Sequence, residues 1–519
     1  MLAKSPTGTW LPAWVPESSA LISVLLLFCA AVESSTNGFD GSLLNGLNVL
    51  KVYTGYFNLT PATQGLNTAS VYIGKILGLT VAGVLTDRLG RRPTIFWSSI
   101  VSLIGIVIQS AAQNIAMFVV GRAILGLGSC WAGVASAVYL TETFSARWRS
   151  WGVAILQNFY YVGALLAAGV TLGTGRWNST WAWRAPSLFQ GIFAIICIVI
   201  LPFIPESPRW LVGQGRPEDA HKVLAQVNAR GNLQDPVVLA EYQMIVETLN
   251  YERAMAGRAP SLKDLIRTPV ARRRLLIGSS PGLFSCVAGN IIASYYLGTE
   301  LGAAGITNAN DKLKANVVLN SWCLVCCLFG TQLAVRWGRK PTALTAQFLL
   351  TVFLMTIGGL TKKYSADPAG ASNALVYGNV ACIFLFQGAY SVAWTPLMSL
   401  YPPEILNFSI RANGVAVKQY ANAIPALVLV YVMPIGLANL GWKMYIINAS
   451  WNIVTFVLIA VYWVETKGRS LEEIDEIFEG KKKHETIEVL KSAGQLNILD
   501  HEMDLNKETV DVEVSEVKD

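Results

Sequence analysis

Charged residues are scarce in this chain, and histidine is nearly missing. Asp, Glu, Lys and Arg make up only 14% of the 519 residues, whereas soluble domains average about 25%. Long apolar runs separate the few charges, so the composition excludes an ordinary soluble domain and indicates a membrane protein. All three histidines (His221, His484 and His501) fall outside these runs. Histidine therefore cannot carry a proton within the membrane-spanning part of the chain.

The signatures of several other protein classes are missing as well. No small-residue cleavage site follows the first apolar run, so no cleavable signal peptide is predicted. The eight cysteines lie in or beside apolar runs, and we expect free thiols rather than a disulfide framework. Cys323-x-x-Cys326-Cys327 lacks histidine or acidic partners, which favours helix packing over a metal site.

No enzyme motif is visible either. We find no nucleophile–base set and no phosphate-binding loop in the sequence. Gly126-Leu-Gly128 lies in an apolar run without a preceding strand, which favours close helix packing over dinucleotide binding. We therefore predict that the protein is not an enzyme and that it uses no cofactor and no metal.

The net charge of +7 could indicate binding to nucleic acid. The basic residues cluster instead in short loops between apolar runs, which is the pattern of cytoplasmic loops in membrane proteins. We therefore predict no nucleic-acid partner, and both termini on the cytoplasmic side. On the opposite side Asn178-Ser-Thr is a possible glycosylation site, and Asn58-Leu-Thr is a weaker one because Pro61 follows it.

The apolar runs predict an all-α integral membrane protein with twelve transmembrane helices of about 20 residues or more. Their expected ranges are 20–46, 66–86, 94–112, 116–138, 152–173, 187–204, 274–298, 315–335, 342–361, 374–400, 412–437 and 443–464. We divide the chain into a cytoplasmic N-terminal segment (1–19), a first six-helix half (20–204), a cytoplasmic helical linker (205–272), a second six-helix half (273–464) and a cytoplasmic tail (465–519) that is largely disordered after about residue 485.

Three motifs occur twice along the chain, in the same order. Asp87-Arg-Leu-Gly-Arg-Arg-Pro-Thr94 returns as Val335-Arg-Trp-Gly-Arg-Lys-Pro-Thr342, Tyr139-x-x-Glu142 returns as Tyr401-x-x-Glu404, and Glu206-Ser-Pro-Arg209 returns loosely as Glu465-Thr-Lys-Gly-Arg469. Such a repeat indicates two homologous halves of parallel topology, the arrangement of transporters whose binding site lies between the halves.

The charged residues of these motifs are candidates for a gate. Arginines can pair with the glutamates, and we expect such pairs to lock the two halves together on the cytoplasmic face and to break when that face opens. The alternative is that they only anchor the topology. The candidate gating residues are Asp87, Arg88, Arg91, Arg92, Glu142, Arg149, Glu206, Arg209, Arg339, Glu404, Arg411, Glu465 and Arg469.

Asp40 is an acid inside the first apolar run, within Ser35-Thr-Asn-Gly-Phe-Asp-Gly-Ser42. An acid at the middle of a spanning helix costs roughly 2.5–3.5 kcal/mol, so a chain that keeps one usually needs it to face a cavity. We interpret Asp40 as a proton-coupling site of a secondary transporter.

At this point a family resemblance is visible over residues 20–480. The matching motifs are Gly83-x-Leu-x-Asp87-Arg-x-Gly-Arg-Arg92, Gly121-Arg122, Tyr139-x-x-Glu142, Pro205-Glu-Ser-Pro-Arg-Trp-Leu211 and Glu465-Thr-Lys-Gly-Arg-Ser-Leu471. With them the chain resembles the sugar-porter branch of the major facilitator superfamily. Thr36-Asn-Gly-Phe-Asp-Gly-Ser42, Gly289-Asn290 with Ser294-Tyr-Tyr-Leu297, and Tyr401-Pro-x-Glu404 look like its fungal lactose-permease-like and hexose-transporter subgroup.

The resemblance implies the major facilitator fold, alternating access, and transport of a sugar or related polyol. It also implies proton coupling by the acid of the first helix with the arginine of the fourth, here Asp40 and Arg122. The alternative is a static pair in a facilitator that moves no protons.

Two further charges lie in the apolar runs. Glu33 precedes Asp40 by about two helical turns, so both can share one helix face. Lys75 lies in the middle of the second run, where an unpaired lysine is costly. We hypothesise that Lys75 pairs with Glu33 or Asp40 and takes part in proton coupling. The alternative is that it snorkels or faces water.

A sugar site needs side chains that replace the hydrogen bonds each hydroxyl loses with water. The resemblance implies Gln157 as a ligand in the first half. In the second half the pattern thins, because Cys286, Cys323, Met398 and Met433 stand where the branch usually has amides. The remaining candidates there are Asn290, Tyr295, Tyr296 and Trp394, although the aromatic residues are equally common in helix packing.

We therefore predict a proton-coupled symporter of a sugar or sugar-like metabolite. Its expected partners are a small-molecule substrate, protons and the lipid bilayer, and we expect a monomer in the plasma membrane. Two alternatives stay open: the same fold moving, or exporting, a less polar metabolite, and a sensor that binds sugar but transports little.

Overall fold

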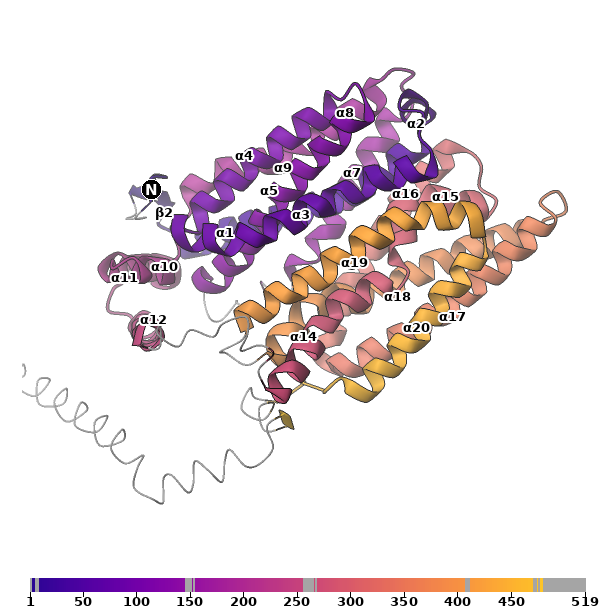
Figure 1. Cartoon of the computed structure of the whole chain (residues 1–519). Coiled ribbons are helices and arrows are strands. Elements are labelled where there is room, and N and C mark those ends of the chain that lie inside the picture. Colours follow the sequence, from indigo (N-terminus) through magenta and orange to yellow (C-terminus); the bar gives the residue numbers. More distant parts are fainter. Residues whose placement is uncertain are drawn as a thin grey trace, which may run out of the picture.

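A computed structural model of the chain describes residues 2–4, 9–144, 152, 155–254, 266, 268–406, 411–469, 474, 477 and 478. Its helices run roughly side by side in two bundles, drawn in indigo to magenta and in rose to yellow in Figure 1. Both bundles are all-helical in the described residues, in agreement with the predicted fold class.

The first bundle contains the helices before the linker, several of them interrupted by short turns. They are α1 (Ser19–Val49), α2 (Lys51–Tyr56), α3 (Pro61–Leu89), α4 (Arg91–Ser110), α5 (Ile115–Thr143), α7 (Phe159–Thr174), α8 (Trp181–Phe189), α9 (Gly191–Ile200) and the 3₁₀ turn η1 (Leu201–Phe203).

The second bundle repeats this pattern with seven helices, of which the first two together form one candidate span. They are α14 (Pro269–Val287), α15 (Asn290–Ala303), α16 (Ala309–Trp337), α17 (Arg339–Ala366), α18 (Asn373–Ile405), α19 (Arg411–Leu440) and α20 (Lys443–Tyr462). Between α14 and α15 the chain turns at Gly289, whose φ of 94° lies in the region that glycine adopts most easily.

Eleven segments of the described residues are long and apolar enough to cross a membrane. Two of them are composite, one combining α8, α9 and η1 and the other combining α14 and α15. The shorter apolar helix α7 lies where the fifth of the twelve predicted spans was expected. The chain is therefore a multi-pass membrane protein, and the order of the predicted spans is confirmed.

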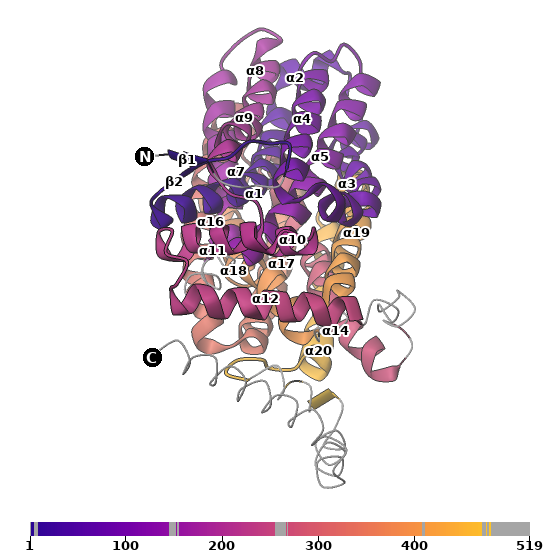
Figure 2. The ribbon, with the colours of Figure 1, turned by 90° about the vertical axis from the view of Figure 1, so that its left-hand side faces the viewer.

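Three helices follow the first bundle at one end of the molecule, and Figure 2 looks onto them. They are α10 (Pro208–Gly213), α11 (Pro217–Ala229) and α12 (Pro236–Ala254), each beginning with proline, which suits a first helical position because it lacks the N–H that would be unpaired there. We call this end of the molecule the basic end, because the arginines of the repeated motifs lie there.

The first residues of the chain form a small hairpin that the sequence did not predict. Strand β1 (Leu2–Lys4) pairs antiparallel with β2 (Trp14–Pro16). Val15 is fully buried, and the guanidinium of Arg92 donates hydrogen bonds to the carbonyls of Leu11 and Pro12. These contacts hold the segment against the basic end of the first bundle.

Close helix contact explains the glycines of the fourth span. A Cβ atom on Gly126 of α5 would lie 2.0 Å from the carbonyl oxygen of Val71 in α3, which no side chain permits. The helix-packing interpretation of Gly126-Leu-Gly128 is therefore correct, because α3 and α5 touch backbone to backbone.

Candidate functional site

Asp40 and Arg122 form an ion pair in the interior of the first bundle. Nη1 and Nη2 of Arg122 on α5 donate to Oδ1 and Oδ2 of Asp40 on α1, both at 2.8 Å. The arginine is fully buried and Asp40 is 5% exposed. Such a bidentate, water-excluded pair is strong, but removing either partner leaves an uncompensated charge in the membrane.

Two polar groups complete the surroundings of this pair. Gln190, at the start of α9, donates to Asp40 Oδ1 over 3.3 Å, and the Nε of Arg122 donates to the carbonyl of Asn67 over 2.7 Å. The pair therefore joins α1, α3, α5 and α9. A change in its protonation would be transmitted to four helices of the same half.

A narrow cavity lies between the two bundles. Its walls come from α1, α7, α15, α16 and α18, so both halves contribute. The lining residues are Ser42, Asn45, Tyr160, Tyr161, Ala164, Ala293, Ser294, Asn316, Leu319, Asn320, Cys323 and Gln387. Most of them carry hydroxyl or amide groups, which suit a polar ligand.

Asn45 closes this cavity at the end of the molecule opposite the basic end. Its amide nitrogen donates to the carbonyls of Ala293 and Ser294 over 3.0 and 2.7 Å, and its oxygen accepts from the N–H of Leu297 at 2.9 Å. These bonds join α1 of the first half to α15 of the second. We call this contact the Asn45 latch.

At the basic end of the first half, glutamates hold the start of α4. Arg91 donates to both carboxylate oxygens of Glu142 at 2.8 Å. The carboxylate of Glu206 accepts the backbone N–H groups of Arg91 and Arg92, and the Ser207 hydroxyl donates to Glu142 over 2.6 Å.

The second half repeats this arrangement residue by residue. Arg339 donates to Glu404 over 3.1 and 2.6 Å, and the Thr466 hydroxyl donates to Glu404 over 2.6 Å. The carboxylate of Glu465 accepts the backbone N–H groups of Arg339 and Lys340 at 3.0 and 2.9 Å. The internal repeat read from the motifs is therefore a repeat of structure.

The family model described as "Sugar (and other) transporter" matches residues 26–478. This chain belongs to that transporter family. The transporter is similar to the MFS-type transporter oryC of Aspergillus oryzae, with 30% identity over 91% of this chain and 86% of that protein. It is also similar to the high-affinity glucose transporter of Kluyveromyces lactis, with 27% identity over 87% and 84% of the two chains.

More distant proteins extend the similarity. The arabinose-proton symporter of Bacillus subtilis is 26% identical over 89% of this chain and 97% of that protein. Among solved structures, the proton:xylose symporter XylE bound to 6-bromo-6-deoxy-D-glucose has a TM-score of 0.72, with 21% identity over 89% of this chain and 100% of that chain. A partially occluded inward-open structure of XylE from E. coli has a TM-score of 0.71 and 20% identity, over 87% of this chain and 100% of that chain. This likeness shows the major facilitator fold.

The pairs at the basic end of the transporter correct one prediction. Arg91–Glu142 and Arg339–Glu404 each lie within one half, so the described pairs do not lock the two halves together. The physical reason is proximity: the loop that starts α4 folds back beside the end of α5 in the same bundle, and the same holds for α17 and α18.

The other candidate gating residues are exposed or half-buried, or lie outside the described part of the transporter. Asp87 and Arg88 are exposed, although Asp87 accepts a long 3.4 Å bond from Arg91. Arg209 is half-buried, and Arg469 is exposed. Three predicted features lie outside the described part of the chain. They are Arg149, the side chain of Arg411 and the tail after residue 478.

The predicted direct pairing of Lys75 with an acid is wrong. The ammonium of Lys75 donates to the side-chain oxygen of Asn37 over 2.7 Å, and the Asn37 amide nitrogen donates to Glu33 over 2.5 Å. Asn37 therefore bridges the two charges. It lies one helical turn after Glu33 on α1, which brings its amide between the carboxylate and α3.

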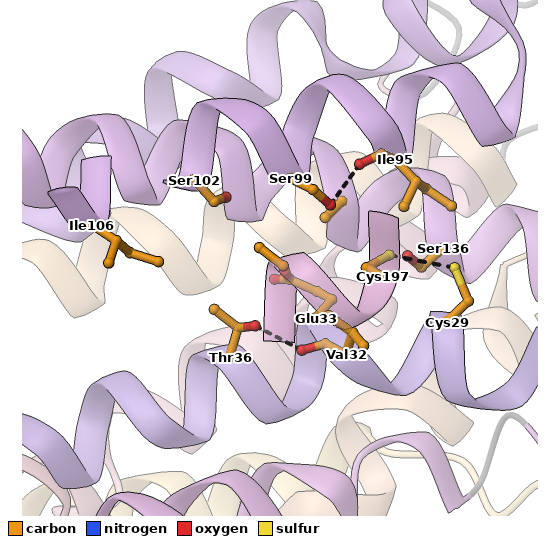
Figure 3. A pocket seen from close by; sticks show the side chains of 12 residues that line it. Cys29, Val32, Glu33, Thr36, Ile95, Ser99, Ser102, Ile106, Ser136 and Cys197 are labelled. Atoms are coloured by element: carbon orange, nitrogen blue, oxygen red, sulfur yellow. Dashed lines mark hydrogen bonds between the residues drawn. The ribbon is translucent and has the colours of Figure 1, made fainter. Parts of the chain in front are cut away.

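Glu33 also lines a second cavity, inside the first half, between α1, α4, α5 and α9 (Figure 3). The hydroxyls of Thr36 and Ser99 in its wall bond back to their own helices. Cys29 and Cys197 meet there with their sulfur atoms 3.5 Å apart, and all eight cysteines are free thiols.

None of the five predicted substrate ligands of this transporter lines the central cavity. Trp394 is fully buried in an aromatic cluster with Phe284 and Trp463, so it packs. The hydroxyl of Tyr296 donates to the carbonyl of Val430 over 2.8 Å within the same half.

The remaining three predicted ligands lie closer to the cavity. The Tyr295 hydroxyl meets that of Tyr72 at 2.9 Å, across the two halves. Asn290 accepts a 2.9 Å bond from Ser294, which itself lines the cavity. Gln157 is half-buried in a turn just before α7.

The sequence reasoning missed the amides that do line the cavity. Asn316, Asn320 and Gln387 all come from the second half, so its wall is richer in amides than the substitutions at Cys286 and Cys323 indicated. The spacing of Asn316 and Asn320, one turn apart in an otherwise apolar helix, is the signal that could have found them.

Proposed function

We propose that this protein is a proton-coupled symporter that moves a sugar or sugar-like metabolite by alternating access. The observation that carries the proposal is the buried, bidentate pair of Asp40 and Arg122 in a membrane span. A proton bound by this acid would neutralise the carboxylate to which Arg122 and Gln190 donate, and would weaken its attraction for the arginine. Loading a proton would release Arg122 and change the contacts of four helices.

The central cavity supports a polyhydroxylated substrate. Hydroxyl and amide groups from both halves face it, and each can replace a hydrogen bond that a sugar hydroxyl loses with water. The printed names of similar proteins, a glucose transporter and an arabinose-proton symporter, agree with this substrate class and with proton coupling. The cavity-lining amides of the second half argue against the alternative of a less polar substrate.

Alternating access would proceed by opposite changes at the two ends. The Asn45 latch joins the halves at one end and would break when that end opens. At the basic end the glutamate–arginine pairs would keep the ends of each half rigid, so that the halves move as bodies. We assign gating to these groups in this indirect sense.

The remaining assignments rest on the loops. We propose that the basic end, with both termini and the linker 205–272, is cytoplasmic, because its arginines follow the positive-inside pattern. Asn178 and Asn58 are exposed near the opposite end, where glycosylation would take place. We further propose the division into halves at 20–204 and 273–464, a plasma-membrane location and a monomer.

The test is uptake of labelled glucose, lactose and cellobiose by cells without sugar carriers of their own, with and without a protonophore. We expect the protonophore and Asp40→Asn to abolish accumulation of at least one of these sugars. Asp311→Asn is the matched control, because its carboxylate is half-exposed and pairs only with Lys314 at the start of α16. Undiminished accumulation in Asp40→Asn would contradict the coupling role.

A further inference from the structure

Lys418 is a cation buried in a membrane-spanning helix without a counter-charge. It lies in α19 and is only 6% exposed. Within the described residues, no acid forms an ion pair with its ammonium and no acceptor forms a hydrogen bond with it. An unpaired lysine in a span is costly, so its retention calls for a partner that the folded chain does not supply.

Comparison with four other cations in the helices makes Lys418 distinct. Arg122 is neutralised by Asp40 and Arg91 by Glu142. The guanidinium of Arg92 donates to backbone carbonyls, including that of Leu201 at 2.8 Å. Lys75 donates to Asn37, which leads on to Glu33. Each of these cations has acceptors within the chain, whereas Lys418 has none among the described residues.

The helix that carries Lys418 lies at the contact between the two halves. It packs against α14 of its own half and against α3 of the first half. Asn422, one turn after Lys418, donates to the Cys286 sulfur over 3.1 Å. Tyr72 meets Tyr295 at 2.9 Å. Lys418 therefore belongs to a helix that both halves contact.

A continuous line of polar side chains leads from the central cavity toward this position. Gln387 in the cavity wall donates to Ser294 over 3.4 Å, and Ser294 donates to Asn290 over 2.9 Å. Asn290 begins α15, directly after α14, and Cys286 near the end of α14 accepts a bond from Asn422, one turn after Lys418. A ligand that spans this line would meet hydroxyl-binding groups at one end and a free cation at the other.

We propose that Lys418 binds the carboxylate of the transported molecule, so that the substrate is a polyhydroxylated carboxylic acid, of the uronic or aldonic acid class. The amides and hydroxyls of the central cavity bind its hydroxyl groups, and the ammonium binds its anionic end. This inference rests on the proposed transport function and narrows its substrate. It follows that a neutral sugar leaves the buried cation unpaired and is the poorer substrate.

The test compares labelled D-glucuronate with labelled D-glucose, which differ only at the carbon that bears the carboxylate. The full-length protein in proteoliposomes is assayed as wild type, Lys418→Gln, Lys418→Arg and the control Lys443→Gln, which removes an exposed lysine at the start of α20. We expect wild type and control to prefer D-glucuronate. Lys418→Gln should lose about tenfold or more of D-glucuronate uptake and little of D-glucose uptake, and Lys418→Arg should keep part of the former.

A second measurement needs no variant, in case Lys418→Gln fails to fold. Unlabelled D-glucuronate, its neutral amide D-glucuronamide, and acetate compete against labelled substrate in the wild type. D-Glucuronate should inhibit at a concentration about tenfold lower than either competitor. Equal inhibition by the amide would overturn the role of the charge, and equal inhibition by acetate would overturn the need for hydroxyls.

The outcomes separate this inference from the proposed function. Proton-dependent D-glucose uptake without D-glucuronate uptake overturns the inference and leaves the function standing. D-Glucuronate uptake that depends on Lys418 but resists a protonophore supports the inference and contradicts coupling. If neither compound is taken up, D-glucuronate is not a substrate and the inference fails.

Discussion

Glu465 caps helix α17 in the same way that Glu206 caps helix α4. Each carboxylate accepts the first two backbone N–H groups of its helix, and each follows the last span of its half. The helix N-terminus favours such a negative group. The turn that begins each helix is a glycine with positive φ, Gly90 at 99° and Gly338 at 115°. One carboxylate thus ties the end of each half to its middle.

The first prediction concerns Gly90. Gly90→Ala should destabilise the protein by about 1–3 kcal/mol, because this backbone conformation is nearly exclusive to glycine. A Cβ there would also lie 2.8 Å from the Glu206 carboxylate. Gly83→Ala is the control, since its Cβ would meet nothing within 4 Å and the change removes glycine from a helix interior. Thermal unfolding in detergent measures both, and equal stability of the two variants would refute the prediction.

The second prediction compares the two arginine–glutamate pairs. Glu142→Ala should destabilise the protein by about 3 kcal/mol or more, because it strands a buried arginine. Side-chain exposure is 9% for Arg91 and 11% for Glu142, against 14% for Arg339 and 26% for Glu404. Glu404→Ala should therefore cost less, since water can solvate the cation that remains. The apparent melting temperatures check the order, and a larger loss in Glu404→Ala would contradict it.

The third prediction concerns pH. Burial raises the pKa of Glu206 to about 7, although the N–H groups of Ser207 and Arg92 and the charges of Arg92 and Arg91 lower it. The folded protein then binds a proton more tightly than the unfolded chain, so stability from this group falls as the pH rises from about 4.5 to about 7.

Glu465 should behave in the opposite way. Partial burial raises its pKa, but the backbone N–H groups of Lys467, Arg339 and Lys340 outweigh this and lower it below the ordinary value. Its contribution is therefore present near neutral pH and is lost as the pH falls through the lowered pKa. The check is the melting temperature measured from pH 4 to pH 8. Between about pH 4.5 and about pH 7 it should fall less with rising pH in Glu206→Gln than in the wild type. Toward pH 4 it should fall less with decreasing pH in Glu465→Gln than in the wild type. Identical profiles for both variants would count against this account.

The fourth prediction concerns the Asn45 latch. Asn45→Ala removes hydrogen bonds worth about 0.5–1.5 kcal/mol each, so the population open at the end opposite the basic end should rise about tenfold or more. Spin labels at Asn178 and Asp311, on different halves at that end, report the opening as a longer distance. Thr54→Ala is the control, because its hydroxyl bonds only to Leu50 and Lys51 nearby. An unchanged distance distribution in Asn45→Ala would contradict the prediction that Asn45 holds this end closed.

The fifth prediction tests the bridge between Lys75 and Glu33. If this bridge takes part in coupling, Lys75→Met should shift the pH dependence of uptake, because Glu33 loses the cation that Asn37 connects to it. Asn37→Leu should produce a shift in the same direction by breaking the bridge from its centre. If the pH dependence of uptake is unchanged in both variants, the role of Lys75 is structural only.

Much of this fold is readable from the sequence, for definite reasons. Spans are long apolar segments, and lipid forces their backbone into helices, so composition alone places them. The repeated motifs predicted two similar halves. They recur because the same unusual turn is formed in each half, by Gly90 and by Gly338. The pairing of Asp40 with Arg122 followed from the cost of isolated charges and from the family resemblance. The hairpin of β1 and β2 was not predicted, because its short strands carry no clear pattern.

The cavity wall was harder to predict than the spans. Asn316, Asn320 and Gln387 line it, whereas the predicted Trp394 and Tyr296 pack within the second half. A rotation of a helix by part of a turn decides which side chains face the cavity, and an apolar helix in lipid carries little periodic signal to reveal that rotation.

The sequence by itself determined the membrane spans, the two-half repeat and the identity of the charges that the membrane must accommodate. Only the tertiary structure decided which of those charges meet. Arg91 pairs within its own half, Asn37 separates Lys75 from Glu33, and Lys418 is left without a partner among the described residues. The physical reason is that the energy of a charge depends on atoms a few ångströms away, which come from helices distant in the chain.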